Sequence, residues 1–184
     1  DMALWCFCFA VGVHIKVMPM QRDHLWPAAR LLRRAFSPSD TVGPLIVAEH
    51  YLQLAQRLHT SHALVALDER DERLVGYVEL LMPEYLAGTI PDAPPDLAAR
   101  LMPVLSSLAV DESSRGAGVG TRLVQACEEH VRTCGVARRG VSLQVEEDNR
   151  VALRLYEKKL GYRIVRRERV KKLVGMSASL PELP

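Results

Sequence analysis

The most restrictive feature of the sequence is an apolar run followed by a glycine-rich turn and an amphipathic stretch. Val104–Val110 has the composition of a strand, Gly116–Gly120 has glycine at every second position, and Val119–Cys134 has helical periodicity. Glycine lets main-chain N–H groups approach a ligand without a Cβ in the way. The start of a helix adds unpaired N–H groups and the positive end of its dipole. The pattern therefore predicts a site for an anion such as a pyrophosphate.

Two other phosphate-binding motifs differ from this turn. A P-loop ends in Gly-Lys-Ser/Thr, whereas Gly120 is followed by Thr121 and Arg122. In a Rossmann dinucleotide site the glycines follow the strand almost at once, whereas Asp111–Arg115 intervenes here. On the glycines alone, a tight turn beside a surface arginine is the plain structural alternative.

Hydrophobic periodicity divides the chain into short alternating elements. Strands are predicted at residues 13–18, 63–67, 74–81, 104–110, 141–145 and from 162 onward, and helices at 24–36, 45–58, 119–134 and 149–160. Asp23 is the expected cap of the first helix. Five prolines between residues 83 and 103 predict a long loop with one helical turn near 97–101. The order of elements indicates an α/β (α+β) domain with a mixed central β-sheet flanked by helices.

Composition and charge narrow the class of protein. The chain has 184 residues, of which 48% are hydrophobic and 25% charged, as is typical of one folded soluble domain. The formal net charge of +2 argues against a nucleic-acid partner. The apolar segment from Met2 to Ile15 is too short to span a bilayer, so no membrane partner is expected. We expect a leading segment at 1–12, a domain at 13–176 and a tail at 177–184.

The cysteines favour a reducing compartment and no metal. The four cysteines show no disulfide spacing, which favours a cytoplasmic location. An organelle such as a plastid is the alternative, because the leading segment is compatible with a remnant of a targeting sequence. Cys127, His130 and Cys134 share a helix face, but no fourth ligand has suitable spacing. No serine-hydrolase or zinc-protease motif occurs.

A second pair of candidate residues lies on the predicted helix 149–160. Asn149 and Tyr156 are separated by two helical turns, which places them on one face. The amide of Asn149 can exchange hydrogen bonds with an amide chain, and the phenol of Tyr156 can hand over a proton. The structural alternatives are a helix cap at Asp148 or Asn149 and a core aromatic at Tyr156.

The two patterns together resemble the GNAT superfamily of N-acetyltransferases. The combination is strand–Arg–Gly–x–Gly–x–Gly–helix, then strand–Asp–Asn–(x)₂–Ala–(x)₃–Tyr, then Leu–Gly–Tyr. The resemblance extends from about Leu105 to Arg163 and is closest in motif to protein N-terminal and lysine acetyltransferases. It implies the GNAT fold and acetyl-CoA as co-substrate.

The resemblance also implies roles for individual residues. In that family the strand before the glycine turn pairs with the pantetheine arm, and the turn cradles the pyrophosphate. The corresponding residues here are Leu108, Ala109 and Val110 of the strand and Arg115, Gly116, Ala117, Gly118, Val119, Gly120 and Thr121 of the turn. The resemblance makes Asn149 a pantetheine contact and Tyr156 the general acid.

The sequence departs from the family pattern in two places. Some bacterial ribosomal-protein acetyltransferases of the family place a glutamate base five residues before the asparagine, where this chain has Gln144. The last helix also has one extra residue before its glycine, Gly161. Glu79 is the first candidate for the general base, since it shares a strand face with Tyr77. The alternative is a solvated strand glutamate.

The predicted function is acetyl transfer to a primary amine, with a protein N-terminal α-amine or a lysine as acceptor. A small-molecule amine acetyltransferase, a non-catalytic acyl-CoA-binding sensor and a dinucleotide-dependent oxidoreductase are the alternatives. Acceptor specificity is expected to reside in residues 36–62 and 83–103, where no motif identifies the acceptor.

Overall fold

The computed structural model describes residues 14–36, 44–136, 140–168 and 173–180. Its strands are β1 (Ile15–Pro19), β2 (His62–Asp68), β3 (Leu74–Leu81), β4 (Val104–Val110), β5 (Gly140–Glu146), β6 (Arg163–Glu168) and β7 (Leu173–Ser179). Its helices are α1 (Leu25–Phe36), α2 (Pro44–Arg57), α3 (Pro83–Gly88), α4 (Leu97–Arg100), α5 (Val119–Thr133) and α6 (Arg150–Arg154). The expected leading segment, residues 1–12, lies outside the described residues.

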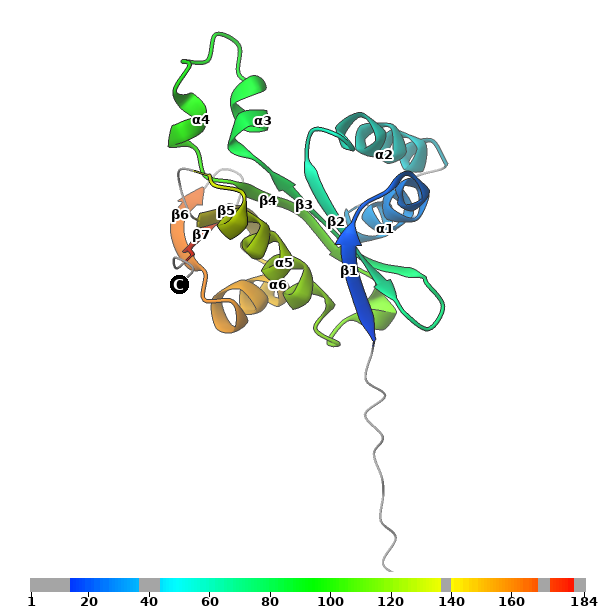
Figure 1. Cartoon of the computed structure of the whole chain (residues 1–184). Coiled ribbons are helices and arrows are strands. Elements are labelled where there is room, and N and C mark those ends of the chain that lie inside the picture. The colour runs from blue at the N-terminus through cyan, green and yellow to red at the C-terminus, as the bar shows by residue number, and fades with distance from the viewer. Residues whose placement is uncertain (1–13, 37–43, 137–139, 169–172, 181–184) are drawn as a thin grey trace, which may run out of the picture.

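The described strands form one seven-stranded sheet in the order β1-β2-β3-β4-β5-β7-β6 (Figure 1). Neighbouring strands run antiparallel except for β4 and β5, which are parallel. Helices flank this mixed sheet, so the fold class expected from the sequence is confirmed.

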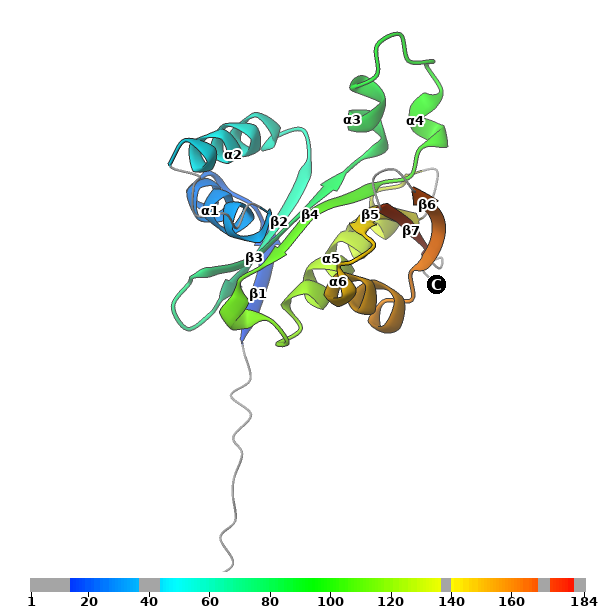
Figure 2. The ribbon, with the colours of Figure 1, turned by 180° about the vertical axis from the view of Figure 1, so that it is seen from behind.

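Helices cover both faces of the sheet, because alternate side chains of the central strands point to opposite faces. α1 and α2 pack on one face, and α5 and α6 lie on the other (Figures 1 and 2). On β3, Val78 and Leu80 belong to the core under α5, whereas Tyr77 belongs to the core under α1 and α2. Glu79 lies on the same face as Tyr77, as the sequence predicts.

β4 and β5 lie side by side at their beginnings and then separate. Their parallel pairing is limited to Val104–Leu105 against Ser142–Leu143. Just beyond, Ser107 has a φ of 55°, and the register between β3 and β4 shifts, so β4 carries a bulge. A bulge bends its strand. The bend coincides with the point where β4 leaves β5, and an opening results between two parallel strands at the middle of the sheet.

α5 crosses the sheet close to β3 because β3 has a glycine where the helix passes. A Cβ at Gly76 would lie 2.8 Å from Cγ1 of Val119 and 2.9 Å from Cδ1 of Leu123. Both of these side chains lie in the first half of α5 and are buried. Gly76 therefore sets how closely the beginning of α5 approaches the sheet beside the opening.

The segment between β3 and β4 differs from the expected loop. Pro83–Gly88 forms α3, which no pattern in the sequence predicted. Pro83 occupies the first helical position, where a fixed φ and a missing N–H suit the start of a helix, so this proline begins a helix instead of breaking one. The predicted helical turn near 97–101 is confirmed as α4. α3 and α4 form an arm that extends beyond the end of the sheet (Figures 1 and 2).

The helix predicted at 149–160 changes its type half-way. Arg150–Arg154 is α-helical, whereas Leu155–Lys159 is a π-helical turn. The N–H of Leu160 donates to the carbonyl of Leu155 at 3.2 Å. A π turn accommodates one extra residue within a helix. It therefore explains how the additional residue in this helix is absorbed.

Two boundaries also differ from the expectation. β7 continues through Ser179, so residues 177–179 belong to the sheet and not to a tail. At the start of α1, Asp23 lies inside a short 3₁₀ turn, and the N–H of Gln21 donates to Nδ1 of His24 at 3.0 Å. Gln21 is the N-cap of this 3₁₀ turn, which leads into α1, and Asp23 is not a cap.

Candidate active site

The glycine turn between β4 and α5 leaves a row of main-chain N–H groups without partners. Gly116 and Gly118 have φ values of 81° and 82°, in the left-handed region that favours glycine. Gly118 is the N-cap of α5, and its carbonyl accepts the N–H of Arg122 at 3.0 Å. Among the described residues, no main-chain acceptor pairs with the N–H groups from Gly118 to Thr121. These groups and the helix dipole together suit an anion.

The three glycines of the turn are required for different reasons. A Cβ at Gly116 or Gly118 would meet no atom within 4 Å, so these two are required by conformation and face open space. A Cβ at Gly120 would lie 3.3 Å from Cδ2 of Leu155, so Gly120 allows the start of α5 to pack against the π turn. Arg115 is exposed at the rim of the turn. An anion at the turn would therefore have open space, free main-chain N–H groups and the guanidinium of Arg115 at the rim.

The residues predicted to pair with the pantetheine arm lie on the open edge of β4. Leu108, Ala109 and Val110 follow the bulge, and β4 remains paired with β3 there. In the described part of the chain, β4 has no strand partner on its β5 side beyond Leu105. An unpaired strand edge can pair with an extended ligand. Residues 111–115 separate this edge from the glycine turn along the chain, but a Cβ at Gly120 would lie 3.7 Å from Cγ2 of Val110, so the two features are adjacent in space.

Asn149 is the N-cap of α6. Its side-chain oxygen accepts the N–H of Ala152 at 3.0 Å, and the residue is exposed. Asn149 therefore caps the helix, which is the structural alternative given for it above. Oδ1 is occupied by the cap. The Nδ2 amide group is therefore the part of the Asn149 side chain that remains available to donate a hydrogen bond to a ligand. The contact with pantetheine stays a prediction that rests on this group.

Tyr156 lies in the π turn and is buried, with 5% of its surface exposed. Its ring packs against Tyr162, with the ring centroids 5.5 Å apart. Burial, and to a lesser extent Cys127, raises the pKa of Tyr156, so its hydroxyl is protonated at neutral pH. Tyr156 is therefore a core aromatic residue whose hydroxyl still carries the proton that a donor needs. The role of general acid stays a prediction.

Glu79 lies on the opposite face of the sheet from Tyr156 and has 1% of its surface exposed. Its carboxylate accepts hydrogen bonds from Nη1 of Arg57 at 3.0 Å and from the hydroxyl of Ser61 at 2.8 Å. Glu79 is therefore not a solvated strand glutamate. Each of its two carboxylate oxygens already has a hydrogen-bonding partner. The structure does not bring Glu79 and Tyr156 into contact with each other.

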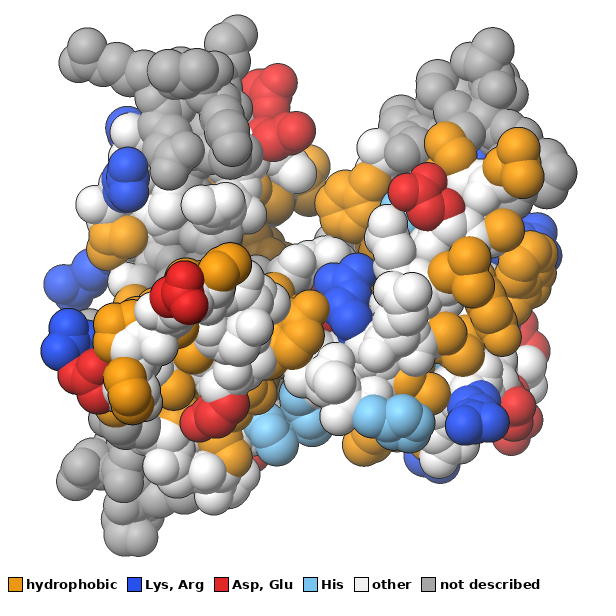
Figure 3. All heavy atoms as spheres, turned by 90° about the horizontal axis from the view of Figure 1, so that it is seen from above, with side chains coloured by type: hydrophobic (Ala, Val, Ile, Leu, Met, Phe, Trp, Pro, Cys, Tyr) orange, Lys and Arg blue, Asp and Glu red, His pale blue; other side chains and the backbone are white. Residues whose placement is uncertain are grey.

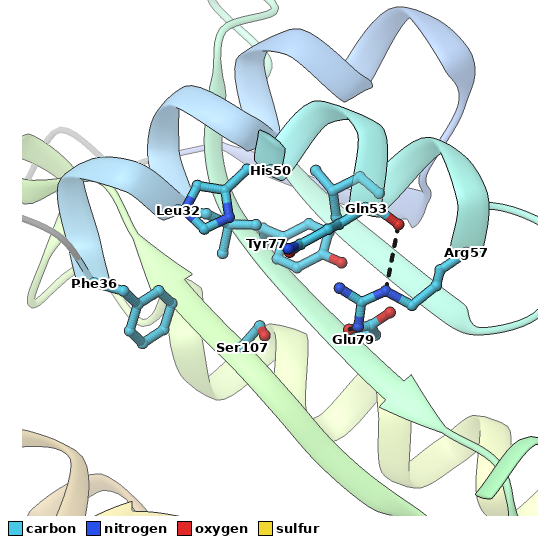
Figure 4. A pocket seen from close by; sticks show the side chains of 9 residues that line it. Leu32, Phe36, His50, Gln53, Arg57, Tyr77, Glu79 and Ser107 are labelled. Atoms are coloured by element: carbon cyan, nitrogen blue, oxygen red, sulfur yellow. Dashed lines mark hydrogen bonds and ion pairs between the residues drawn. The ribbon is translucent and has the colours of Figure 1, made fainter. Parts of the chain in front are cut away.

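A cavity of about 260 Å³ lies between α1, α2 and the sheet (Figure 4). Its apolar wall consists of Leu32, Phe36 and Leu54. Its polar lining consists of His50, Gln53, Arg57, Tyr77, Glu79 and Ser107. Because Ser107 is the bulge residue of β4, the cavity reaches the strand that borders the opening. Figure 3 shows the surface hollowed between the side that carries α3 and α4 and the side that carries α2, with a cationic side chain inside.

Two polar atoms beside this cavity have no hydrogen-bond partner among the described residues. They are the hydroxyl of Tyr77, a residue with 0% of its surface exposed, and Nε2 of His50. In Figure 4 the hydroxyl of Tyr77 points toward Arg57 and Glu79. Buried polar groups are nearly always hydrogen-bonded. The two atoms are therefore hydrogen-bonding groups that the described residues leave unused beside the cavity.

Most of the cavity residues are not identified by any motif in the sequence. His50 and Arg57 lie two helical turns apart on α2, but polar residues on a helix are ordinarily a solvated face. The available signals were weak. Glu79 interrupts an apolar strand, and Ser107 belongs to a pair of serines inside another. The predicted specificity region 36–62 does supply part of the lining, whereas 83–103 supplies none of it.

The described residues contain neither a metal-binding cluster nor a membrane-spanning helix. Within the described ranges, no group of three His, Cys, Asp or Glu side chains is arranged to hold a metal ion. No helix among the same residues is long and apolar enough to cross a membrane.

Sequence comparison identifies the family. The sequence profile of the acetyltransferase (GNAT) family matches residues 25–162, a span that includes β4, the glycine turn, Asn149 and Tyr156. The chain therefore belongs to the GNAT family of acetyltransferases, enzymes that transfer an acetyl group from acetyl-CoA. No curated protein sequence matched the chain.

Solved structures of acetyltransferases share the fold. The PaiA N-acetyltransferase from Thermoplasma acidophilum, in complex with coenzyme A, has a TM-score of 0.65 and 15% identity, covering 91% of this chain and 99% of that one. The NatC complex bound to Gag peptide and CoA has a TM-score of 0.64 and 18% identity, covering 91% of this chain and 99% of that one. Aminoglycoside 6'-acetyltransferase type Ii has a TM-score of 0.63 and 20% identity, covering 92% of this chain and 99% of that one. At these identities the likeness extends to the fold, while the acceptor is left undecided.

Proposed function

We propose that this enzyme acetylates a primary amine of a protein or peptide. The observation that carries the proposal is that the free N–H groups at Gly118–Thr121 lie beside the unpaired edge of β4. The first feature suits a diphosphate and the second suits an extended amide chain. Coenzyme A contains both, in that order along its length.

The residues of the opening fit acetyl-CoA as follows. Main-chain N–H groups between Gly116 and Thr121 would hold the pyrophosphate, with Arg115 adding a fixed charge at the rim. The edge from Leu108 to Val110 would pair with the pantetheine arm, and the Nδ2 group of Asn149 would donate to it. The bound coenzyme supplies an activated thioester.

Tyr156 is proposed to donate a proton to the departing sulfur. Burial keeps its hydroxyl protonated at neutral pH, as a proton donor requires. The π turn that carries Tyr156 begins at Leu155, which packs against Gly120 of the glycine turn. This contact ties the position of the phenol to the site of the pyrophosphate.

The acceptor amine must be neutral when it attacks. Glu79 is the candidate base, and its carboxylate is paired with Arg57 and Ser61. An α-amine has a pKa of about 7.7–8.0, whereas the pKa of lysine is about 10.4. An α-amine is therefore partly neutral at physiological pH and depends less on a strong base.

An acetylation assay over three sets of acceptors tests the proposal. The sets are peptides with free N-termini, peptides with a blocked N-terminus and an internal lysine, and small polyamines, each with acetyl-CoA and detected by mass spectrometry. Transfer to either peptide set supports the proposal, and transfer to polyamines alone contradicts it. Acetyl-CoA at 100 times its Kd should also stabilise the fold by about 2.7 kcal/mol. Binding without transfer to any acceptor would make the protein an acyl-CoA sensor.

A further inference from the structure

The cavity between α2 and the sheet has a charge balance that limits what it can accept. Among the described residues of its lining Glu79 is the one carboxylate, and Arg57 and Ser61 already occupy that carboxylate. A polycationic acceptor would bring further positive charges next to Arg57, where the described lining has no free carboxylate to offset them. A carboxylate on the acceptor would meet Glu79 across the same space. The cavity therefore favours a group without charge.

The cavity nevertheless contains unused hydrogen-bonding capacity. The hydroxyl of Tyr77 can donate and accept, and Nε2 of His50 can do either according to its tautomer. Around them, Leu32, Phe36 and Leu54 provide apolar surface. An uncharged group with an apolar stem and one hydrogen-bonding atom matches both features. A purely apolar group would leave the two polar atoms buried and unpaired.

We propose that this cavity binds the first side chain of a peptide acceptor and selects an uncharged side chain whose polar atom pairs with the hydroxyl of Tyr77. The proposal rests on the acetyl transfer proposed above and narrows its substrate to the α-amine of a peptide. In such an acceptor the first side chain branches from the atom that carries the amine. In a lysine acceptor only methylene groups lie next to the amine, and they offer nothing to the two polar atoms.

The position of the cavity agrees with this assignment. Ser107 lines the cavity and also forms the bulge at which β4 leaves β5. An amine at the bulge therefore has the opening on one side and the cavity on the other. Phe36, with 56% of its surface exposed, lies at the rim of the cavity, where an acceptor would enter.

Equilibrium binding to the enzyme loaded with coenzyme A tests the selection without relying on turnover. The probes are pairs of tetrapeptides that differ only at the first residue: threonine against valine, and asparagine against leucine. A peptide that begins with aspartate is added to each pair. We expect the threonine and asparagine peptides to bind more tightly than their apolar partners by roughly 5- to 150-fold, because an unpaired buried polar group is costly. The aspartate peptide should bind most weakly.

Two matched tyrosine variants separate a ligand contact from a structural role. Tyr77→Phe removes the unpartnered hydroxyl, whereas Tyr51→Phe removes a hydroxyl on α2 from a ring that packs against Trp26 and does not line the cavity. Tyr77→Phe should abolish the preference for threonine over valine and leave the Tm unchanged or raised, since its hydroxyl has no partner to lose. Tyr51→Phe should keep the preference.

Three results would overturn the proposal. They are equal binding of the paired peptides, tightest binding of the aspartate peptide, and a Tyr77→Phe variant with a lower Tm and an unchanged preference. Acetylation of the same peptides is measured in parallel. Selective binding without acetylation would contradict the proposed acetyl transfer while supporting the cavity. Acetylation without selectivity would contradict only the cavity.

Discussion

The two halves of the candidate site are made from different kinds of groups. The coenzyme half consists of main-chain N–H groups and a strand edge within the continuous stretch 104–121. The acceptor half consists of side chains from α1, α2, β3 and β4, which the fold brings together around one cavity. A half made of backbone tolerates almost any side chain outside its glycines. A half made of side chains changes with each substitution. The first therefore defines the family, and the second defines the individual enzyme.

The largest expected effect concerns Tyr156, which lies on the sheet face opposite the acceptor cavity. Tyr156→Phe removes the proposed proton donor and keeps the buried ring. We expect kcat to fall by roughly 10²–10⁴-fold with little change in affinity for acetyl-CoA. Steady-state kinetics and equilibrium binding of the coenzyme give the two quantities. An unchanged kcat at saturating substrates would remove Tyr156 from this role.

A pair of glycine variants tests whether the coenzyme half depends on backbone geometry. Gly118 and Gly135 begin and follow the same helix, have φ values of 82° and 73°, and both face open space. Alanine at either position should cost about 1–2 kcal/mol of stability. Only Gly118→Ala should also raise the KM for acetyl-CoA, by about tenfold if ~1.4 kcal/mol of binding is lost. Equal KM values in the two variants would mean that the turn does not hold the coenzyme.

A smaller effect separates the two roles of Asn149. Serine is a good helix cap and has no amide, whereas alanine provides neither a cap nor a donor. Asn149→Ser should keep the Tm and raise the KM for acetyl-CoA by roughly 2- to 12-fold, the range for one neutral hydrogen bond. Asn149→Ala should raise the KM similarly and also lose about 0.5–2 kcal/mol of stability. If serine leaves the KM unchanged, Asn149 is a cap and nothing more.

The smallest effect concerns a histidine pair outside both halves. The rings of His62 and His130 stack with centroids 3.6 Å apart, and burial together with His130 lowers the pKa of His62 from 6.5 to about 4. Between these values the unfolded chain binds more protons at His62 than the folded chain does. Stability should therefore fall as the pH is lowered from about 6.5 to about 4, with no further loss from this group below that. Neither half should lose affinity through this titration.

Thermal unfolding between pH 7 and pH 4 checks the histidine prediction. The His62→Gln variant should show a flatter dependence of Tm on pH than the unmodified chain, because the residue that titrates is missing. Parallel curves for the two proteins would contradict the assignment of the pKa shift to folding stability.

Much of the fold could be predicted because its signals are local. The alternating faces of β3 follow from the two-residue period of a strand, and the ends of α5 follow from the glycines on either side. The sequence does not predict α3, because a proline ordinarily breaks a helix, whereas Pro83 occupies the first helical position, which suits proline. The one sequence signal of the π turn at Leu155–Lys159 is the extra residue in this helix before Gly161.

The residues of the candidate site also differ in whether the sequence alone can locate them. The residues of the glycine turn could be located from sequence, because their function depends on main-chain conformation, which glycine reports directly. His50 and Tyr77 could not, because what marks them is the lack of a partner, and that is a property of packing. Gly120 illustrates the limit: its place in the turn was recognised, but its contact with Leu155 belongs to the tertiary structure.

A crystal structure of this enzyme with coenzyme A tests the central claim most directly. The account predicts the diphosphate within hydrogen-bonding distance of the N–H groups of Gly118–Thr121, and the sulfur between the bulge at Ser107 and the hydroxyl of Tyr156. A diphosphate bound away from the glycine turn, or a sulfur remote from that hydroxyl, would contradict it.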